Sequence, residues 1–309
     1  MKSKCIVICG PTASGKSSLA IEMSRLFNGI IISADSMQIY KTLDIGTAKP
    51  TKEEQARAEH KLIDFLEPDE PFSVANYQKL CLEEIEKAQD RGKLPFLVGG
   101  TGLYIDSVVN NLQYVPIPND DKLRADIEKR YDTEGGEKLL EELYEIDPET
   151  ASRLFPRDRK RIVRALEVFK LTGRSLSYHN SLSRSVPSPT EFLKIVLSFK
   201  NRELLYERIN KRVEIMFLQG LLEEAQELYL NGYKDSPTAS QAIAYKELFG
   251  YFSGAHSLQE AKELLKQRSR NYAKRQITWF KRMDAHFIYM DGTDPINEVK
   301  ELIEGFINE

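Results

Sequence analysis

The apolar pattern near the N-terminus predicts a strand, a glycine-rich loop and a helix in direct succession. A strand is predicted at residues 4–9, because residues 5–9 form a short apolar run rich in β-branched side chains, which is typical of a buried strand. The run ends at Gly10, and from Lys16 to Phe27 the apolar residues recur at helical spacing. These residues therefore predict the first unit of an α/β fold.

Strand and helix patterns continue to alternate up to residue 100. A helix is predicted from Ser73 to Arg91, because Ser73 suits an N-cap, apolar residues line one face and Gly92 ends the pattern. Further strands are predicted at Ile30–Ser33, His60–Leu66 and Leu94–Val98. Strands that alternate with helices indicate a parallel sheet flanked by helices.

The pattern changes beyond residue 115. After a proline-marked connection, the sequence from about Asp120 to Lys170 is charge-rich and helical, with no strand candidate. The Ser- and Pro-rich segment Asn180–Thr190 is typical of a linker, and Phe192–Phe199 alternates like a strand that rejoins the sheet. We therefore predict a small all-helical domain at residues 116–189, inserted into a core of residues 1–115 and 190–309.

The remainder of the core is predicted to be mostly helical. Long periodic patterns run from Arg202 to Asn231 and from Leu258 to Arg282, and a last short strand is predicted at His286–Met290.

Composition narrows the class of protein. With 309 residues, 41% of them hydrophobic, the chain can bury a large core and a smaller attached unit. The net charge of -3 excludes a uniformly basic surface, and no apolar stretch is long enough to span a membrane. Three scattered cysteines and four scattered histidines suggest neither disulfides nor a zinc site. We expect a cytoplasmic monomer without a membrane partner.

The loop after the first strand carries a phosphate-binding motif. Eight consecutive residues fit the pattern G-x-x-x-x-G-K-[ST]: Gly10, Pro11, Thr12, Ala13, Ser14, Gly15, Lys16 and Ser17. Glycines let backbone N–H groups converge on an anion, Lys16 adds a point charge, and the Ser17 hydroxyl can bind Mg²⁺. The motif and its position predict a P-loop NTPase-like core.

The residues predicted to lie near this loop must indicate which reaction takes place there. The strand at residues 94–98 ends in Gly99-Gly100-Thr101 and not in an aspartate, which weakens an ordinary ATPase or kinase. Asp35 follows the second strand and suits a metal ligand, a general base or a turn cap, and Asp64 in the third strand is a further candidate for a metal-side carboxylate. Thr101 can stabilise a developing charge on oxygen or cap the next helix.

Across nearly its whole length the sequence resembles the tRNA dimethylallyltransferase family, the bacterial tRNA isopentenyltransferases. Eight ordered motifs carry the resemblance: Gly10–Ser17, Asp35–Tyr40, Asp44–Pro50, His60–Asp64, Gly99–Tyr104, Arg164–Val168, Gln241–Glu247 and Ala273–Phe280. One departure is Ala244, where the family more often has glycine.

The resemblance implies transfer of a dimethylallyl group from dimethylallyl diphosphate to N6 of the adenosine on the 3′ side of the anticodon. The loop would then hold a prenyl diphosphate, which explains the missing aspartate. Asp35 would accept the N6 proton and Thr101 would assist. Lys16, the loop amides, Mg²⁺ on Ser17 and one arginine of the pair Arg208 and Arg212, with Arg212 favoured, would stabilise the leaving diphosphate.

Two basic segments are candidates for binding the anticodon stem-loop of tRNA. They lie in the inserted helical block and between Lys266 and Lys281, although such charges also occur on solvated helix faces. The resemblance places these residues at the RNA: Asp35, Ser36, Met37, Gln38, Thr101, Lys160, Arg161, Ile162, Val163, Arg164, Gln241, Ala242, Ile243, Ala244, Tyr245, Lys246, Lys274, Arg275, Gln276, Trp279 and Lys281.

Two other functions fit parts of the sequence. A P-loop small-molecule kinase or nucleotidase would use the same loop on ATP, and a non-catalytic RNA-binding protein would use only the basic segments.

Overall fold

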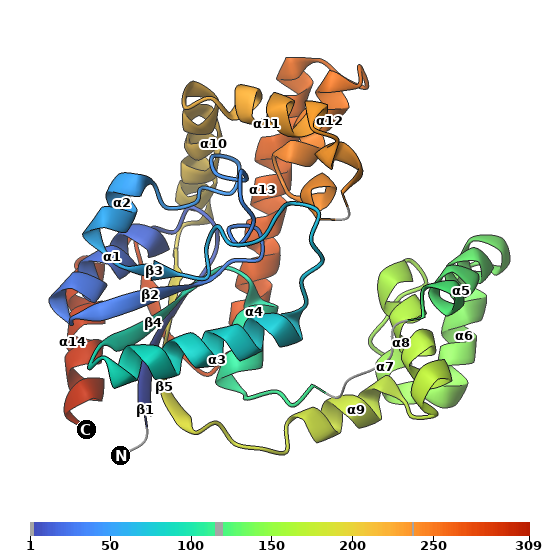
Figure 1. The fold of residues 1–309 in the computed structure, drawn as a ribbon, viewed down its shortest axis with the longest axis horizontal. Coiled ribbons are helices and arrows are strands. Elements are labelled where there is room, and N and C mark those ends of the chain that lie inside the picture. Colours follow the sequence, from blue (N-terminus) through green and yellow to red (C-terminus); the bar gives the residue numbers. More distant parts are fainter. Residues whose placement is uncertain (1–2, 115–119, 237) are drawn as a thin grey trace. The chain divides into compact units, whose positions relative to one another are not determined.

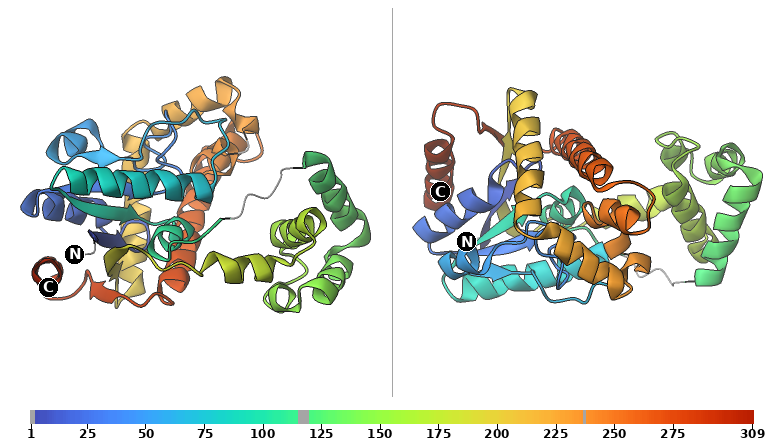
Figure 2. Two further views of the ribbon diagram at one scale, coloured as in Figure 1. Left: turned by 60° about the horizontal axis from the view of Figure 1, so that its bottom comes forward. Right: turned by 90° about the horizontal axis from the view of Figure 1, so that it is seen from above.

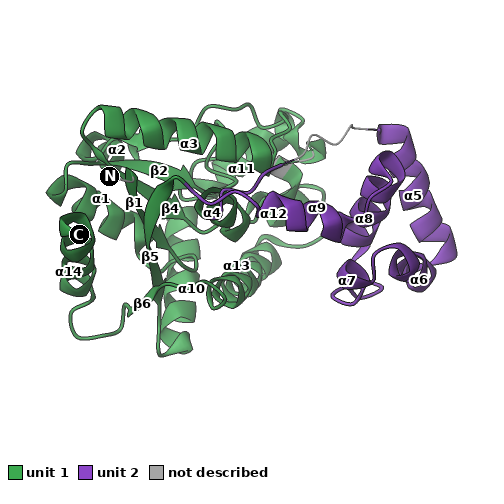
Figure 3. Ribbon diagram, turned by 90° about the horizontal axis from the view of Figure 1, so that it is seen from below, with its two compact units in different colours: residues 1–109, 189–309 green, residues 110–188 purple. Residues whose placement is uncertain are grey.

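The computed structural model describes residues 3–114, 120–236 and 238–309. The chain divides into two compact units, which Figure 3 colours separately. Unit 1 consists of residues 1–109 and 189–309, and unit 2 of residues 110–188.

A parallel six-stranded sheet forms the centre of unit 1, in the order β3-β2-β4-β1-β5-β6. The strands are β1 (Ser3–Cys9), β2 (Gly29–Ala34), β3 (His60–Lys61), β4 (Leu94–Gly99), β5 (Thr190–Ser198) and β6 (His286–Tyr289). Because all strands run in the same direction, their carboxyl ends meet at one edge of the sheet. The parallel α/β fold and the strand that rejoins the sheet after the insertion are confirmed.

Helices cover both faces of this sheet (Figure 1). They are α1 (Lys16–Leu26), α2 (Lys52–Arg57), α3 (Val74–Asp90), α4 (Gly102–Val109), α10 (Arg202–Leu218), α11 (Leu221–Leu230), α12 (Tyr245–Phe252), α13 (Leu258–Phe280) and α14 (Pro295–Asn308). Ile6 and Ile8 pack with α1 and α14, whereas Cys5 and Val7 pack with α3 and α4. Burial on both faces explains why β1 is a continuous apolar run.

The predicted helix after Ser73 is confirmed. The Ser73 hydroxyl accepts a hydrogen bond from Asn76 N at 3.1 Å, and Tyr77, Cys81 and Ile85 are buried against the sheet. The cap satisfies a backbone donor that has no partner within the helix.

The predicted third strand is much too long. Only His60 and Lys61 pair with β2, because Leu62 and Asp64 have φ values of 57° and 59°, which no strand can contain. The segment bends there, and Asp64 does not lie in the sheet.

The helical pattern from Arg202 to Asn231 is confirmed, and it forms two helices. Gly220, with φ of 101°, separates α10 from α11. Helix α10 packs on α13 through Leu205, Ile209 and Ala273, and the same cluster includes Ala13 of the glycine loop. These two helices therefore border the phosphate-binding loop.

Every described element of unit 2 is a helix. The helices are α5 (Asp121–Glu134), α6 (Gly136–Ile146), α7 (Pro148–Ala151), α8 (Arg159–Thr172) and α9 (Leu176–Ser183). Their core contains Ile127, Leu139, Leu143 and Leu166. The linker expected at Asn180–Thr190 begins later than predicted, because a helix capped by Ser175 continues to Ser183.

The first strand, β1, and the last helix, α14, lie close together in unit 1 (Figures 1 and 2). Lys4 Nζ donates a hydrogen bond to the Phe306 carbonyl at 2.6 Å, which joins β1 to the last helix. No helix among the described residues is both long and apolar enough to cross a membrane.

Candidate active site

Three segments of the predicted site follow adjacent strands at one edge of the sheet. The glycine loop follows β1, Asp35 follows β2, and Thr101 comes shortly after β4, which lies between the other two strands. Thr101 N donates to the Ala34 carbonyl at 3.1 Å, which holds the turns after β2 and β4 together. The fold therefore brings these segments together, as parallel topology requires.

The glycine loop has a backbone shape that most residues cannot adopt. Gly10 has φ of 145°, and a Cβ atom there would lie 2.4 Å from the Leu197 carbonyl oxygen of β5. Ala13 and Gly15 also have positive φ, at 62° and 95°. The loop leads directly into α1, so its N–H groups and the helix N-terminus favour an anion.

The positive charge of Lys16 is only partly balanced by negative charge in this site. Its Nζ donates to the Pro11 carbonyl at 2.7 Å. Burial and, next, the charge of Arg212 lower the pKa of Lys16 to about 8, although Asp35 acts in the opposite direction. Burial also lowers the pKa of Arg212. Two half-buried cations beside one carboxylate favour the binding of a polyanion.

Both candidate arginines reach the loop from α10. Arg208 Nε donates to the Ala13 carbonyl at 2.9 Å, and Arg212 Nη1 lies 3.4 Å from Thr12 Oγ1. Arg212 is the one that lines the adjacent cavity. Arg208 therefore braces the loop, while Arg212 points its charge at the space where a diphosphate would lie.

Asp35 uses one carboxylate oxygen to shape its own turn. Its Oδ1 accepts hydrogen bonds from Met37 N at 2.9 Å and from Gln38 N at 3.4 Å. No described residue donates a hydrogen bond to Oδ2, so this oxygen remains available to a substrate. The Thr101 hydroxyl accepts from Ser36 N at 3.0 Å and lies 3.4 Å from the Ser36 hydroxyl, which fixes the next residue of the same turn.

Two tyrosines near this turn were not assigned a role from the sequence. The Tyr77 hydroxyl donates to the Ser33 carbonyl at 2.9 Å and supports the end of β2. Tyr272 of α13 lines the cavity, and burial together with the nearby Asp35 raises its pKa to about 12. It therefore stays a neutral phenol that can donate a hydrogen bond. Only their packing reveals these tyrosines, because neither belongs to a distinctive local pattern.

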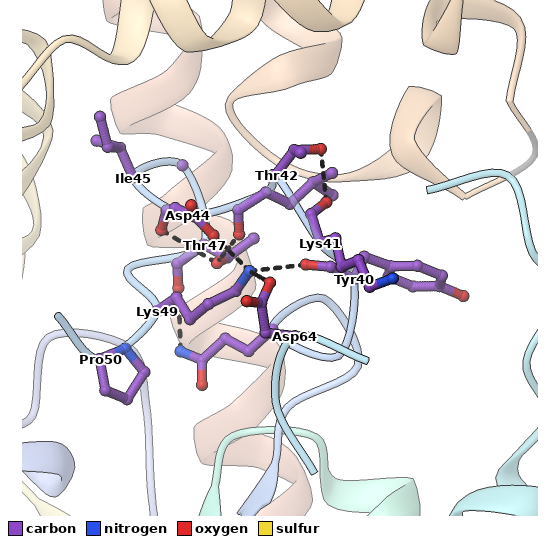
Figure 4. Close-up of polar contacts among 12 residues, drawn as sticks. Tyr40, Lys41, Thr42, Asp44, Ile45, Thr47, Lys49, Pro50 and Asp64 are labelled. Atoms are coloured by element: carbon purple, nitrogen blue, oxygen red, sulfur yellow. Dashed lines mark hydrogen bonds and ion pairs between the residues drawn. The ribbon is translucent and has the colours of Figure 1, made fainter. Parts of the chain in front are cut away.

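A buried lysine organises the loop that follows Gln38 (Figure 4). Lys49 Nζ donates to the Tyr40 carbonyl at 2.7 Å and to Asp64 at 2.8 Å, and it also contacts Asp44. Its side chain is only 4% exposed, whereas the two carboxylates are more than half exposed. The suggestion that Asp64 binds a metal is therefore wrong, because this carboxylate pairs with Lys49.

Glu224 of α11 holds the same loop from the other side. Its carboxylate accepts hydrogen bonds from three successive backbone N–H groups, those of Asp44, Ile45 and Gly46, at 3.2, 2.8 and 3.0 Å. The Tyr245 hydroxyl donates to it at 2.7 Å. A Cβ atom on Gly46 would lie 2.6 Å from the Tyr245 ring, so this close approach requires glycine.

The glycine loop, Asp35 and the Asp44–Pro50 loop border one cavity of about 300 Å³. Its polar wall includes Thr12, Lys16, Ser17, Asp35, Gln38 and Arg212. Its apolar wall comes from α10, from α13 and from the segment before α12, and it includes Ile209, Val213, Met216, Ala242, Ile243 and Leu265. The cavity therefore combines an anion grip, a carboxylate and a hydrocarbon surface.

Several residues expected at the RNA are instead buried supports of unit 1. Tyr245 and Ala244 are fully buried in the cluster around α11 and α12. Gln276 is 5% exposed; it accepts from Thr12 N at 2.8 Å and donates to the Gly100 carbonyl at 2.9 Å. Trp279, in contrast, is exposed, and it donates to Asp106 at 3.1 Å. For Tyr245 and Ala244 the expectation of RNA contact is corrected, because their side chains pack inward.

Ala244 also has an unusual backbone conformation, with φ of 86° and ψ of -55°. A side chain is strained in this region, which glycine adopts readily. Ala244 therefore occupies a backbone conformation that suits the glycine which the family more often has at this position.

The basic residues expected at the RNA differ in exposure. In unit 2, Lys160 and Arg161 are exposed and form no ion pair with a described residue. Ile162 and Val163 are buried in the core of that unit, so the expectation that their side chains contact RNA is corrected. In unit 1, Lys246, Lys274, Arg275 and Lys281 are exposed, and Arg275 lines the cavity.

Few of the described side chains could bind a metal ion. Among the described residues, no group of three or more His, Cys, Asp or Glu side chains could hold a metal ion. The Ser17 side chain is exposed and borders the cavity beside Lys16. A Mg²⁺ ion that takes most of its oxygens from a diphosphate and from water fits this arrangement.

Comparisons with known proteins show the family of this chain. A family model described as IPP transferase matches residues 38–283. The chain belongs to this family. The tRNA dimethylallyltransferase of Caldanaerobacter subterraneus subsp. tengcongensis is 45% identical, over 98% of this chain and 97% of that protein.

Two solved structures of the family have the same fold. The full-length tRNA isopentenylpyrophosphate transferase of Bacillus halodurans is 40% identical, with a TM-score of 0.74 over 98% of this chain and 96% of that one. A eukaryotic dimethylallyltransferase described as acting on tRNA is 27% identical, with a TM-score of 0.82 over 99% of this chain and 80% of that one. The predicted P-loop NTPase-like core is confirmed.

Proposed function

We propose that this enzyme transfers a dimethylallyl group from dimethylallyl diphosphate to N6 of the adenosine on the 3′ side of the anticodon in tRNA. Membership of the family and a tRNA dimethylallyltransferase relative at 45% identity support this function. The cavity carries the proposal, because a phosphate grip, an unoccupied carboxylate oxygen and an apolar wall border the same space.

The two walls match the two halves of a prenyl diphosphate. Lys16, Arg212 and the loop N–H groups would face the diphosphate, whose charge would offset the repulsion between the two half-buried cations. Ile209, Val213 and Met216 of α10 offer a hydrocarbon surface next to this grip. A nucleotide would place a polar sugar against that wall.

In the transfer, the bond between C1 of the dimethylallyl group and the diphosphate oxygen breaks while a bond from C1 to N6 forms. The N6 lone pair is delocalised into the purine, so loss of the N6 proton assists attack. We assign this proton to Asp35, whose Oδ2 is free of internal hydrogen bonds while Oδ1 keeps the turn in place. Thr101 holds Ser36 and the turn at the reaction centre.

Mg²⁺ belongs to the proposal through Ser17. When bound, the ion neutralises charge on the leaving diphosphate, and the Ser17 hydroxyl with the diphosphate oxygens would hold it.

The RNA side of the proposal uses the exposed cations. Lys160 and Arg161 in unit 2 and Lys274, Arg275 and Lys281 on or directly after α13 would contact the phosphates of the anticodon stem-loop. The adenosine must leave its stack to reach a cavity of this kind. Three buried free thiols agree with a cytoplasmic setting, where tRNA is found.

Mass spectrometry of unmodified tRNA, after incubation with dimethylallyl diphosphate and Mg²⁺, tests the function. We expect one adenosine beside the anticodon to gain a dimethylallyl group, with release of diphosphate. Phosphate release from ATP without tRNA modification would indicate a nucleotidase or kinase. Binding of tRNA without modification would leave only an RNA-binding protein, and either result would overturn the proposal.

A further inference from the structure

Unit 2 contains a buried carboxylate that binds two arginines through a single oxygen. Glu167 of α8 is fully buried, and its Oε2 accepts hydrogen bonds from Arg124 at 2.9 Å and from Arg164 at 2.7 Å. Arg124 comes from α5, and Arg164 lies one turn before Glu167 on α8. The contact therefore brings guanidinium groups from two helices to one point.

The two guanidinium groups keep much of their surface in solvent. The side chains of Arg124 and Arg164 are 43% and 41% exposed, whereas that of Glu167 is 0% exposed. Only one N–H group of each arginine binds Glu167, and each guanidinium carries five. The remaining donors are available to a ligand, and the cluster has a net charge of one positive unit.

Stability alone explains this arrangement poorly. No described residue donates a hydrogen bond to Glu167 Oε1, although that oxygen is buried. Burial acts to raise the pKa of Glu167, but the bonds from Arg164 and Arg124 outweigh it and lower the pKa, so the carboxylate is charged at neutral pH. A buried charge with one unsatisfied oxygen costs desolvation energy that an apolar residue of similar volume would avoid.

A different arginine of the same helix lies in a neutral cluster. Arg130 of α5 binds two carboxylates, Glu134 at 2.7 Å and Glu142 at 2.6 Å, and Lys138 also pairs with Glu134, so that cluster has no net charge. The cluster of Arg124, Arg164 and Glu167 has an excess of positive charge and would attract an anion. Lys160 and Arg161, exposed and without ion pairs to described residues, lie on the same helix as Arg164.

We propose that Arg124 and Arg164 together bind one phosphodiester group of the RNA, and that Glu167 is the positioning residue that holds both guanidinium groups for it. This inference rests on the proposed function and adds Arg124 and Glu167 to the RNA-binding residues. Arginine suits the task because its planar fork matches two phosphate oxygens, and a shared carboxylate removes part of the side-chain freedom that binding would otherwise have to restrict.

Salt dependence of tRNA binding distinguishes a shared phosphate from other arrangements. Each phosphate contact contributes about 0.7 to 0.9 to the slope of log affinity against log salt concentration. We expect Arg124→Gln and Arg164→Gln each to reduce the slope by this amount, and the double variant to reduce it no further. Affinity at low salt should fall about tenfold in all three variants. Arg130→Gln, which removes the same charge from the same helix, should leave the slope unchanged.

Glu167→Gln separates positioning from simple electrostatics. This change removes a negative charge beside a polyanionic ligand, so charge alone would strengthen binding. If Glu167 positions the arginines, tRNA affinity instead falls about threefold to tenfold. Thermal unfolding of each variant shows that unit 2 is folded, and Glu167→Asp provides a second variant that keeps the charge but draws it back by one methylene.

The outcomes are separable from those of the proposed function. Wild-type protein must first bind and prenylate unmodified tRNA; if it does not, the function itself fails. If wild type is active but the arginine variants keep its slope, the cluster only joins α5 to α8. If the slope losses add in the double variant, the arginines bind separate phosphates. Tighter binding by Glu167→Gln would overturn the positioning role.

Discussion

Replacing Lys16 by methionine tests the electrostatics of the phosphate loop. In the free enzyme the pKa of Lys16 falls from an ordinary value of 10.5 to about 8, first because of burial and then because of Arg212. At about 1.4 kcal/mol per pH unit, that gap corresponds to roughly 3 kcal/mol of unfavourable energy for the charged lysine. Methionine is an unbranched side chain only one heavy atom shorter than lysine, and it carries no charge.

We expect Lys16→Met to raise the stability of the ligand-free protein at pH 7. The variant loses the hydrogen bond from Nζ to the Pro11 carbonyl, worth about 1 kcal/mol, so the net gain is about 2 kcal/mol. The loop would then be less stable with lysine than without it, because its charge is adapted to an anion that is bound only during function.

The pH dependence follows from the same two pKa values. Below pH 8 the lysine is protonated in both the folded and the unfolded chain, so the full penalty is present. Between about pH 8 and pH 10.5 the folded protein has lost the proton while the unfolded chain still holds it. Wild-type stability therefore rises relative to the variant through this window, and the difference largely disappears at its upper end.

Urea unfolding of both proteins at pH 7, 8.5 and 10 measures this difference, and Lys211→Met on the exposed surface of α10 serves as the matched control. Adding diphosphate and Mg²⁺ should reverse the order, because ligand at a hundredfold excess over Kd stabilises wild type by about 2.7 kcal/mol. The reasoning is refuted if wild type is the more stable protein at pH 7 without ligand and the difference does not change with pH.

Three further predictions concern the proton acceptor, the loop support and the RNA surface. Asp35→Asn keeps the Oδ1 acceptor of the turn but removes the base. The value of kcat should therefore fall by about 10² to 10⁴, while the Kd for tRNA stays within about twofold. Near-normal turnover would exclude a general base at this position. Glu224→Gln replaces one carboxylate oxygen by an NH2 group, which leaves two of the four donors of this clamp without an acceptor. Urea unfolding should therefore show a loss of about 1 to 2 kcal/mol, and steady-state assays a raised KM for tRNA. Unchanged values of both would mean that the Asp44–Pro50 loop does not depend on the clamp. Charge reversal of Lys160 and Arg161 should weaken tRNA binding and flatten its salt dependence, and an unchanged slope in filter binding would remove this part of α8 from the interface.

Local patterns were sufficient for much of the fold and for the phosphate grip. The glycine loop, the strand before it and the helix after it lie within one short stretch, and the N-cap of α3 depends only on neighbours in sequence. The prediction of a third strand at His60–Leu66 failed because it also used only the local pattern. That pattern does not reveal that Leu62 and Asp64 turn the backbone.

The sequence by itself determined the alternation of strands and helices, the anion-binding loop and the family, because each depends on the order and spacing of residues along the chain. Only the tertiary structure decided which side chains face the cavity. Gln276 reaches the Gly100 carbonyl across 176 residues, and Glu224 reaches Gly46 across 178. Tyr245 and Gln276 belong to family motifs, but packing against distant segments turns them into supports. A motif indicates that a residue is near a site, whereas the direction of its side chain depends on partners that the chain brings together only when it folds.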